Sequence, residues 1–152
     1  MTVSGDPSNH TVTSVFPSSN AIDDAVPSKP REYLSQAVNS LHAPAGAVIL
    51  AGSAVDAMLK IKGYEKGSLY TRINSATKDS LITKDMGKWA HQVRLEANDQ
   101  RHADKEAELP TRAEAEQSIR FAVALAEFIF VLPSRVNEGL QESVSAEASA
   151  EG

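Results

Sequence analysis

Apolar residues recur every three or four positions over most of the chain from about residue 30 onward. That spacing places them on one face of an α-helix, whereas a half-buried strand needs apolar and polar residues in alternation. No stretch alternates in this way, so we expect no strand. Helices are expected at about 30–42, 45–62, 69–78, 83–103 and 111–132. Helices joined by short connections predict an all-α fold, an antiparallel bundle of four to five helices.

Several residues mark where these helices begin. Ser68 and Thr83 each precede an apolar-periodic stretch, and their hydroxyl groups suit the N-cap position. Thr111 and Glu114 have the spacing of a capping box, in which two side chains satisfy two free backbone N–H groups. This pair is the clearest helix start in the chain.

The two ends of the chain lack a sustained apolar period. Residues 1–28 are rich in Ser, Thr, Asn and Pro. Pro133 should stop or kink the last helix, and the chain beyond it drifts into Glu, Ser and Ala. We therefore expect a flexible tail at 1–28, a helical bundle domain at 29–136 and a flexible tail at 137–152. The alternative for the first tail is that it orders on a partner.

The helix expected at 45–62 is apolar on nearly all sides, which predicts a central position in the bundle. Its single carboxylate, Asp56, has two interpretations that the sequence leaves open. Asp56 lies at a water-facing edge, or it orients a cation carried by another helix. The last helix also has apolar residues beyond one stripe, which fill the domain's own core or face a second copy of the chain: Phe121, Leu125 and Phe128.

The helix expected at 83–103 has two distinct faces. At about 100° per residue, one face is an apolar stripe that should anchor the helix in the core: Met86, Trp89, Ala90, Val93 and Ala97. Beside it lies a polar arc of imidazole, guanidinium and amide groups: His91, Arg94, Asn98, Arg101 and His102. One helix therefore offers both a packing surface and a row of groups able to do chemistry.

Three members of the polar arc, Arg94, Asn98 and His102, recur at every fourth position and so line up along one side of the helix. An arginine suits phosphate, an amide can orient a ribose hydroxyl, and a histidine moves protons near neutral pH. Together they predict a catalytic site for metal-independent RNA cleavage, completed by the second copy of a dimer. The residues expected to bind a ligand are Arg101, His91 and Asp56.

Two other interpretations of the polar arc stay open. In a purely structural role, Arg94 pairs with Asp56 or Glu96, and His102 caps the end of its helix, where a cation is favourable. In a binding role, Arg94 and Arg101 hold the phosphate of a nucleotide or another small ligand.

The composition narrows the function classes. A net charge of −5 and a pI of about 5.3 disfavour a broadly basic nucleic-acid binder. The chain has no cysteine, which excludes disulfides and thiolate zinc sites. Its histidines are dispersed and HExxH is absent, so we expect no metal and no cofactor. No signal-like start or bilayer-spanning run is visible, so we expect a cytoplasmic protein with no membrane partner.

The order of these patterns resembles the HEPN superfamily of small all-helical domains, and within it an uncharacterised bacterial branch often fused to restriction-type nucleases and helicases. The resemblance covers about residues 30–136. It is carried by PREYLSQAVNSL in the first helix, by GAVILAGSAVDAMLKIKGY in the second, and by Arg94, Asn98 and His102 in the late helix. The resemblance implies a homodimer that acts with RNA or a protein partner in phage defence or an RNA-related stress response.

Two departures from the superfamily's pattern bear on activity. Its nucleases usually place Arg and His four to six residues apart with a polar residue after the Arg, whereas here Leu95 follows Arg94 and His102 lies farther away. Ser53 stands where this branch usually carries an arginine before the acidic residue, here Asp56. We therefore expect a dimeric interaction or regulatory module. A metal-independent, toxin-type endoribonuclease and a nucleotide or phosphate-ligand binder are the alternatives.

Overall fold

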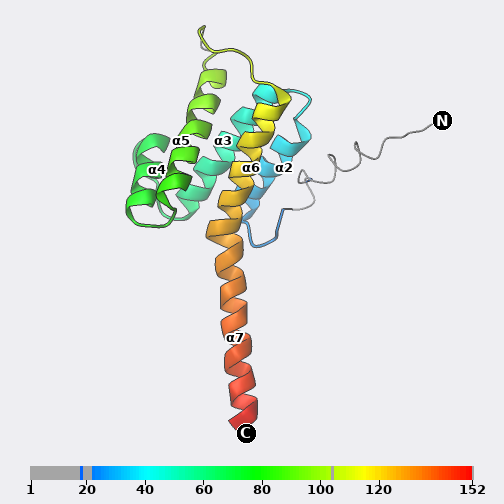
Figure 1. The fold of residues 1–152 in the computed structure, drawn as a ribbon, viewed down its shortest axis with the longest axis vertical. Coiled ribbons are helices and arrows are strands. Elements are labelled where there is room, and N and C mark those ends of the chain that lie inside the picture. The colour runs from blue at the N-terminus through cyan, green and yellow to red at the C-terminus, as the bar shows by residue number, and fades with distance from the viewer. Residues whose placement is uncertain (1–17, 19–21, 104, 152) are drawn as a thin grey trace, which may run out of the picture.

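The computed structural model describes residues 18, 22–103 and 105–151, and over these residues the chain is helical with no strand (Figure 1). The expected all-α antiparallel bundle is confirmed. The helices are α2 (Ser28–Asn39), α3 (Pro44–Ile61), α4 (Leu69–Lys78), α5 (Lys84–Arg101), α6 (Arg112–Ala126), the π-helical turn η2 (Glu127–Val131) and α7 (Leu132–Glu151). The long helices α2, α3, α5 and α6 alternate in direction, so short loops suffice to join their ends.

Helix α3 lies at the centre of the bundle, as its apolar sequence predicts. It packs against α2, α4, α5 and α6, and its buried residues are Ala47, Val48, Ala51, Gly52, Ala54, Val55, Met58 and Leu59. By length and composition α3 would be able to cross a membrane, but 50% of its 18-residue apolar window is buried inside the domain. A helix in the core of a domain passes the same test of length and composition.

The predicted helix starts are confirmed at three places. Ser68 and Thr83 each accept a backbone N–H from the third residue of the helix that follows, at 3.3 and 3.1 Å. At α6, Glu114 N donates to Thr111 Oγ1 at 3.1 Å, and Thr111 N donates to Glu114 Oε1 at 2.8 Å, which completes the capping box. These bonds satisfy N–H groups that a helix start leaves unpaired, and so they fix where α4, α5 and α6 begin.

Packing against the core begins before the expected residue 29, because Ile22 and Ala25 lie against the core and Val26 is buried in it. Val26 is 1% exposed, and its N–H donates to the carbonyl of Asp23 at 3.1 Å. Arg31 of α2 reaches back to the same turn, where its Nη1 lies 3.0 Å from Asp24 Oδ1. Most of the tail predicted over 1–28, namely residues 1–17 and 19–21, lies outside the described residues.

Pro133 marks a change in the last helix but not its end. Helices α6 and α7 form one continuous rod through η2 (Figure 1). Within η2 the hydrogen bonding widens, and Leu132 N donates to the carbonyl of Glu127, five residues earlier. In a regular α-helix a proline ring clashes with the carbonyl four residues before it. A π turn directly before Pro133 changes the position of that carbonyl, and the helix continues.

Helix α7 projects from the bundle and contacts no element other than η2 (Figure 1). The sequence predicts a flexible tail over 137–152, whereas the structure continues as a helix to Glu151. The physical reason for the difference is cooperativity. Helix formation is costly to nucleate and cheap to extend, and the buried helix α6 supplies the nucleus.

For the apolar residues, the structure decides one open alternative and corrects one expectation. Phe121 and Leu125 are both 0% exposed, so they belong to the domain's own core and are not available to a second copy, whereas Phe128 is 38% exposed. Trp89, expected in the core, is 39% exposed, and its ring centroid lies 4.9 Å from that of Phe121. The buried stripe of α5 consists of small residues, which allow close packing: Gly87, Ala90, Val93 and Ala97.

Candidate functional site

Two close helix contacts position the polar arc of α5. A Cβ built on Gly52 of α3 would lie 2.6 Å from the Cβ of Ala97. A Cβ built on Gly87 would lie 2.5 Å from Thr77 Oγ1 of α4. Because glycine allows backbones to approach this closely, α5 is fixed in rotation as well as in distance. One flank of α5 therefore faces α4.

Four side chains meet on this flank, and we call them the Arg94 cluster: Tyr70, Asn74, His91 and Arg94. Arg94 Nε donates to His91 Nδ1 at 3.3 Å, and His91 Nε2 lies 2.9 Å from Asn74 Oδ1. The guanidinium carbon of Arg94 lies 5.1 Å from the centroid of the Tyr70 ring, within cation–π range. The rings of Tyr70 and His91 are 5.0 Å apart. The structure thus brings the expected residues His91 and Arg94 together.

These contacts determine the charge state of His91. A ring nitrogen that accepts from Arg94 carries no proton, so the neutral ring donates from Nε2 to Asn74. Burial, and then the positive charge of Arg94, lower the pKa of His91 below its usual value of 6.5. At neutral pH the Arg94 cluster therefore presents one cation, the guanidinium of Arg94.

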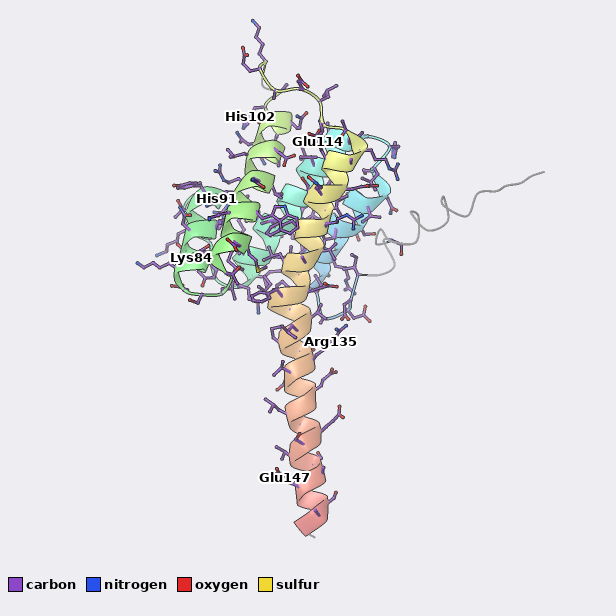
Figure 2. All side chains as sticks on the ribbon, in the orientation of Figure 1. Lys84, His91, His102, Glu114, Arg135 and Glu147 are labelled. Carbon is purple, nitrogen blue, oxygen red and sulfur yellow. The ribbon has the colours of Figure 1, made fainter. Side chains whose placement is uncertain are left out.

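Asn98, Arg101 and His102 lie beyond the cluster, toward the C-terminal end of α5. Figure 2 shows His102 at that end, well past His91. His102 is the C-cap residue of α5 and is exposed. Arg94 lies two turns before it, about 12 Å along the helix axis, and its guanidinium turns back toward His91. Within the described part of the chain, the side chains of Asn98, Arg101 and His102 form no hydrogen bond or ion pair. The row predicted from spacing is therefore divided into two groups.

Asp56 belongs to neither group. Its Oδ1 accepts from Arg72 Nε at 2.8 Å and lies 2.7 Å from Arg72 Nη2, while its Oδ2 lies 3.1 Å from Lys60 Nζ. Arg72 is 7% exposed and also donates to the carbonyl of Gly67. Asp56 thus orients a cation of another helix, which was the second of its two interpretations. That cation is Arg72 of α4 and not Arg94.

The residues that sequence reasoning missed all lie on α4: Tyr70, Arg72 and Asn74. One signal was present, because Tyr70 and Asn74 are four positions apart and share a helix face. No spacing within α4, however, says which helix that face will meet. Arg72 gave no signal, since a lone arginine on a short helix is usually exposed.

The other flank of α5 is acidic. Glu96, Asp99, Glu108 and Glu114 are among the residues that line a surface cavity of about 360 Å³. Burial, and then the nearby charges of Glu114 and Asp99, raise the pKa of Glu96. In the described ranges, no group of three or more His, Asp or Glu side chains is arranged to hold a metal ion. Carboxylates beside the polar arc are unfavourable for the phosphates of RNA.

Comparison with known proteins identifies the family of this chain. No curated protein and no solved structure gives a significant match. Residues 35–143, well over half of the chain, match the family described as "Domain of unknown function (DUF4145)". The match includes α3 to α6 and more than half of α7. The chain therefore belongs to the DUF4145 family.

Proposed function

We propose that this chain is a cytoplasmic, HEPN-like interaction or regulatory module that works as a homodimer and is not an enzyme. Its setting would be phage defence or an RNA-related stress response, with a protein or RNA partner. The resemblance of the chain's sequence patterns to the HEPN superfamily supports this biological setting. The geometry of α5 supports a role without catalysis.

The observation that carries the proposal is the position of Arg94. Its Nε donates to His91, and its guanidinium lies against Tyr70, so the arginine contributes to the packing of α4 on α5. The catalytic site predicted from the sequence needs that cation near His102, the histidine expected to move the proton. In one chain Arg94 turns away from His102, and the acidic flank lies on the other side of the same helix.

Full-length protein incubated with total RNA in EDTA tests this proposal. We expect no cleavage by the wild type and none by Arg94→Ala or His102→Ala. Arg94→Ala should unfold at a lower temperature than the wild type, because it removes contacts to α4. His102→Ala, at the exposed C-cap of α5, and the control Lys88→Ala, at an exposed position within α5, should unfold like the wild type. Cleavage by the wild type that is lost in His102→Ala would overturn the proposal.

One observation favours metal-independent endoribonuclease activity as a second candidate. Among the described residues, the side chains of Asn98 and His102 have no hydrogen-bond partner, so both are free to contact an RNA. A composite site would then need Arg94 or Arg101 from the second copy. If the site is composite, Arg94→Ala and His102→Ala proteins should each be inactive, and mixing them should restore cleavage. A mixture that remains inactive would argue against a composite site.

A further inference from the structure

A surface cavity of about 220 Å³ lies between α2 and α3, which pack side by side in the bundle (Figure 1). We call it the α2–α3 cavity. Its polar lining comes from the first two turns of α2 and the second half of α3: Lys29, Tyr33, Ser53, Asp56 and Lys60. Spacings of three and four place these residues on one face of each helix. No residue of α5 lines the cavity, so it is separate from the Arg94 cluster and from the polar arc.

The α2–α3 cavity is cationic, although the chain as a whole is acidic. Among the described residues that line it, Lys29 and Lys60 carry positive charges and Asp56 carries the one negative charge. Both oxygens of Asp56 are already engaged, because Oδ1 lies 2.7 Å from Arg72 Nη2 and Oδ2 lies 3.1 Å from Lys60 Nζ. Three cations therefore outweigh one carboxylate here. A cleft with an excess of one charge attracts ions of the opposite sign.

Several hydrogen-bond donors of this cavity are not used within the chain. Among the described residues, Lys29 forms no ion pair, and the hydroxyl groups of Tyr33 and Ser53 form no hydrogen bond. The ammonium of Lys60 has further N–H groups besides the one directed at Asp56. Two ammonium groups and two hydroxyl groups thus line one hollow without an acceptor of their own. An anion with several oxygens would supply the acceptors.

The number of donors and the size of the cavity indicate which anion fits. A phosphate monoester carries a charge of about −1.5 to −2 at pH 7 and three strongly accepting oxygens, whereas a carboxylate has one charge and two oxygens. Lysine binds phosphate as a point charge. A volume of about 220 Å³ is below the roughly 300 Å³ at which drug-sized pockets begin. The organic part of the ligand must therefore be small, and the Tyr33 ring, Ala57 and Ile61 offer it apolar contacts.

We propose that the α2–α3 cavity binds the phosphoryl group of a small phosphate monoester. Lys29 and Lys60 contact its charge, and the hydroxyl groups of Tyr33 and Ser53 donate to its oxygens. The ligand is bound and not transformed. This inference goes beyond the proposed function and does not depend on it, because the cavity shares no residue with α5, where the sequence placed a phosphate ligand.

The first test uses phenyl phosphate as the probe. Amide NMR spectra of the full chain, titrated with phenyl phosphate against sodium chloride at equal ionic strength, should show saturable shifts around residues 29–33 and 53–61. Lys29→Ala should weaken binding about tenfold, because it removes a charge-assisted contact. The control Lys88→Ala removes an exposed lysine of α5 and should bind like the wild type. No saturable shifts, or unchanged affinity in Lys29→Ala, would overturn the proposal.

The second test removes single hydroxyl groups. Tyr33→Phe and Ser53→Ala each delete a donor that has no partner among the described residues. Each should weaken the binding of phenyl phosphate by about threefold to tenfold. Neither should lower the unfolding temperature of the ligand-free protein, so a loss of affinity would not come from a loss of structure. If both variants bind phenyl phosphate as tightly as the wild type, the proposed contacts are wrong.

Three further ligands determine what the cavity recognises. Inorganic phosphate should shift the same amides but bind more weakly than phenyl phosphate, because it lacks the ring. Benzoate should bind more weakly still, because it has one charge and two oxygens. Inorganic phosphate or benzoate that binds as tightly as phenyl phosphate would overturn the assignment to a phosphate monoester. A short RNA that shifts these amides at a lower concentration would replace the small ligand by a nucleic-acid backbone. The RNA cleavage assay tests the proposed function separately.

Discussion

The interactions of Asp56 and Arg72 are the clearest case of one residue determining the role of another. Arg72 is 7% exposed, and its charge is tolerated because Asp56, at 2.7 Å, and the carbonyl of Gly67 surround it. A buried cation without such partners costs several kcal/mol. The pair joins α3 to α4 and so holds α4 in the orientation from which Tyr70 and Asn74 reach α5.

Removing only the carboxylate of this pair should be more damaging than removing both charges. We expect Asp56→Ala to lower the free energy of unfolding by about 2–4 kcal/mol, because it leaves the Arg72 guanidinium buried and unpaired. Adding Arg72→Met should recover part of that loss. Urea denaturation measures the free energy of unfolding of both variants. As a control, Lys60→Ala, which removes the exposed partner of Asp56, should stay within ~0.5 kcal/mol of the wild type. A double variant less stable than Asp56→Ala would contradict this account.

Protonation of His91 should weaken the contact between α4 and α5. The folded state holds His91 neutral because its pKa is lowered, so the unfolded chain binds more protons as the pH falls through 6.5. Stability contributed by neutral His91 is therefore present above pH 6.5 and is lost in more acidic solution. We expect the unfolding temperature to fall between about pH 7.5 and 5. His91→Gln should flatten this dependence, while the exposed control His42→Gln should retain it.

At the scale of single helices, α5 shows how packing divides a sequence pattern. Its polar arc is continuous in sequence, but α4 lies beside only part of it. His91 and Arg94 meet α4, whereas His102 lies past the region of contact (Figure 2). The division follows from the length of α4, which runs antiparallel to α5. Helix α4 begins at Leu69, next to the Tyr70 that contacts Arg94, and its other end approaches Gly87 closely through Thr77.

Two glycines of α3 should respond oppositely to the same substitution. Gly52→Ala would bring two Cβ atoms within 2.6 Å, so α3 and α5 must separate, and we expect a loss of about 1–3 kcal/mol. Gly46 has nothing within 4 Å of its added Cβ, so Gly46→Ala should stabilise the helix by roughly 0.5–1 kcal/mol. Thermal unfolding of the two variants checks this pair. Equal effects would show that the α3–α5 contact is looser than described.

At the scale of the whole molecule, the chain consists of a packed bundle and an unpacked rod. The core is built around α3, and it draws on every other helix of the bundle. The rod continues α6 without adding to that core. A net charge of −5 makes non-specific contact of the whole molecule with nucleic acid unfavourable.

Much of the architecture was predictable because it depends on local interactions. The caps at Ser68, Thr83 and Thr111 involve residues within one helical turn, so their spacing in the sequence fixes their geometry. The central position of α3 follows from its apolar composition. The end of the last helix was harder to predict from the sequence, because a local π turn lets the helix continue past Pro133.

The candidate site was less predictable because its partners are distant in sequence. Asp56 and Arg72 are 16 residues apart, and Asn74 and His91 are 17 apart, so each pair depends on how two helices are rotated against each other. The sequence by itself determined the helices of the bundle, the starts of α4, α5 and α6, and the polar arc on α5. Only the tertiary structure decided which polar groups meet, because the small residues at the helix contacts set the rotation of α5 against α3 and α4.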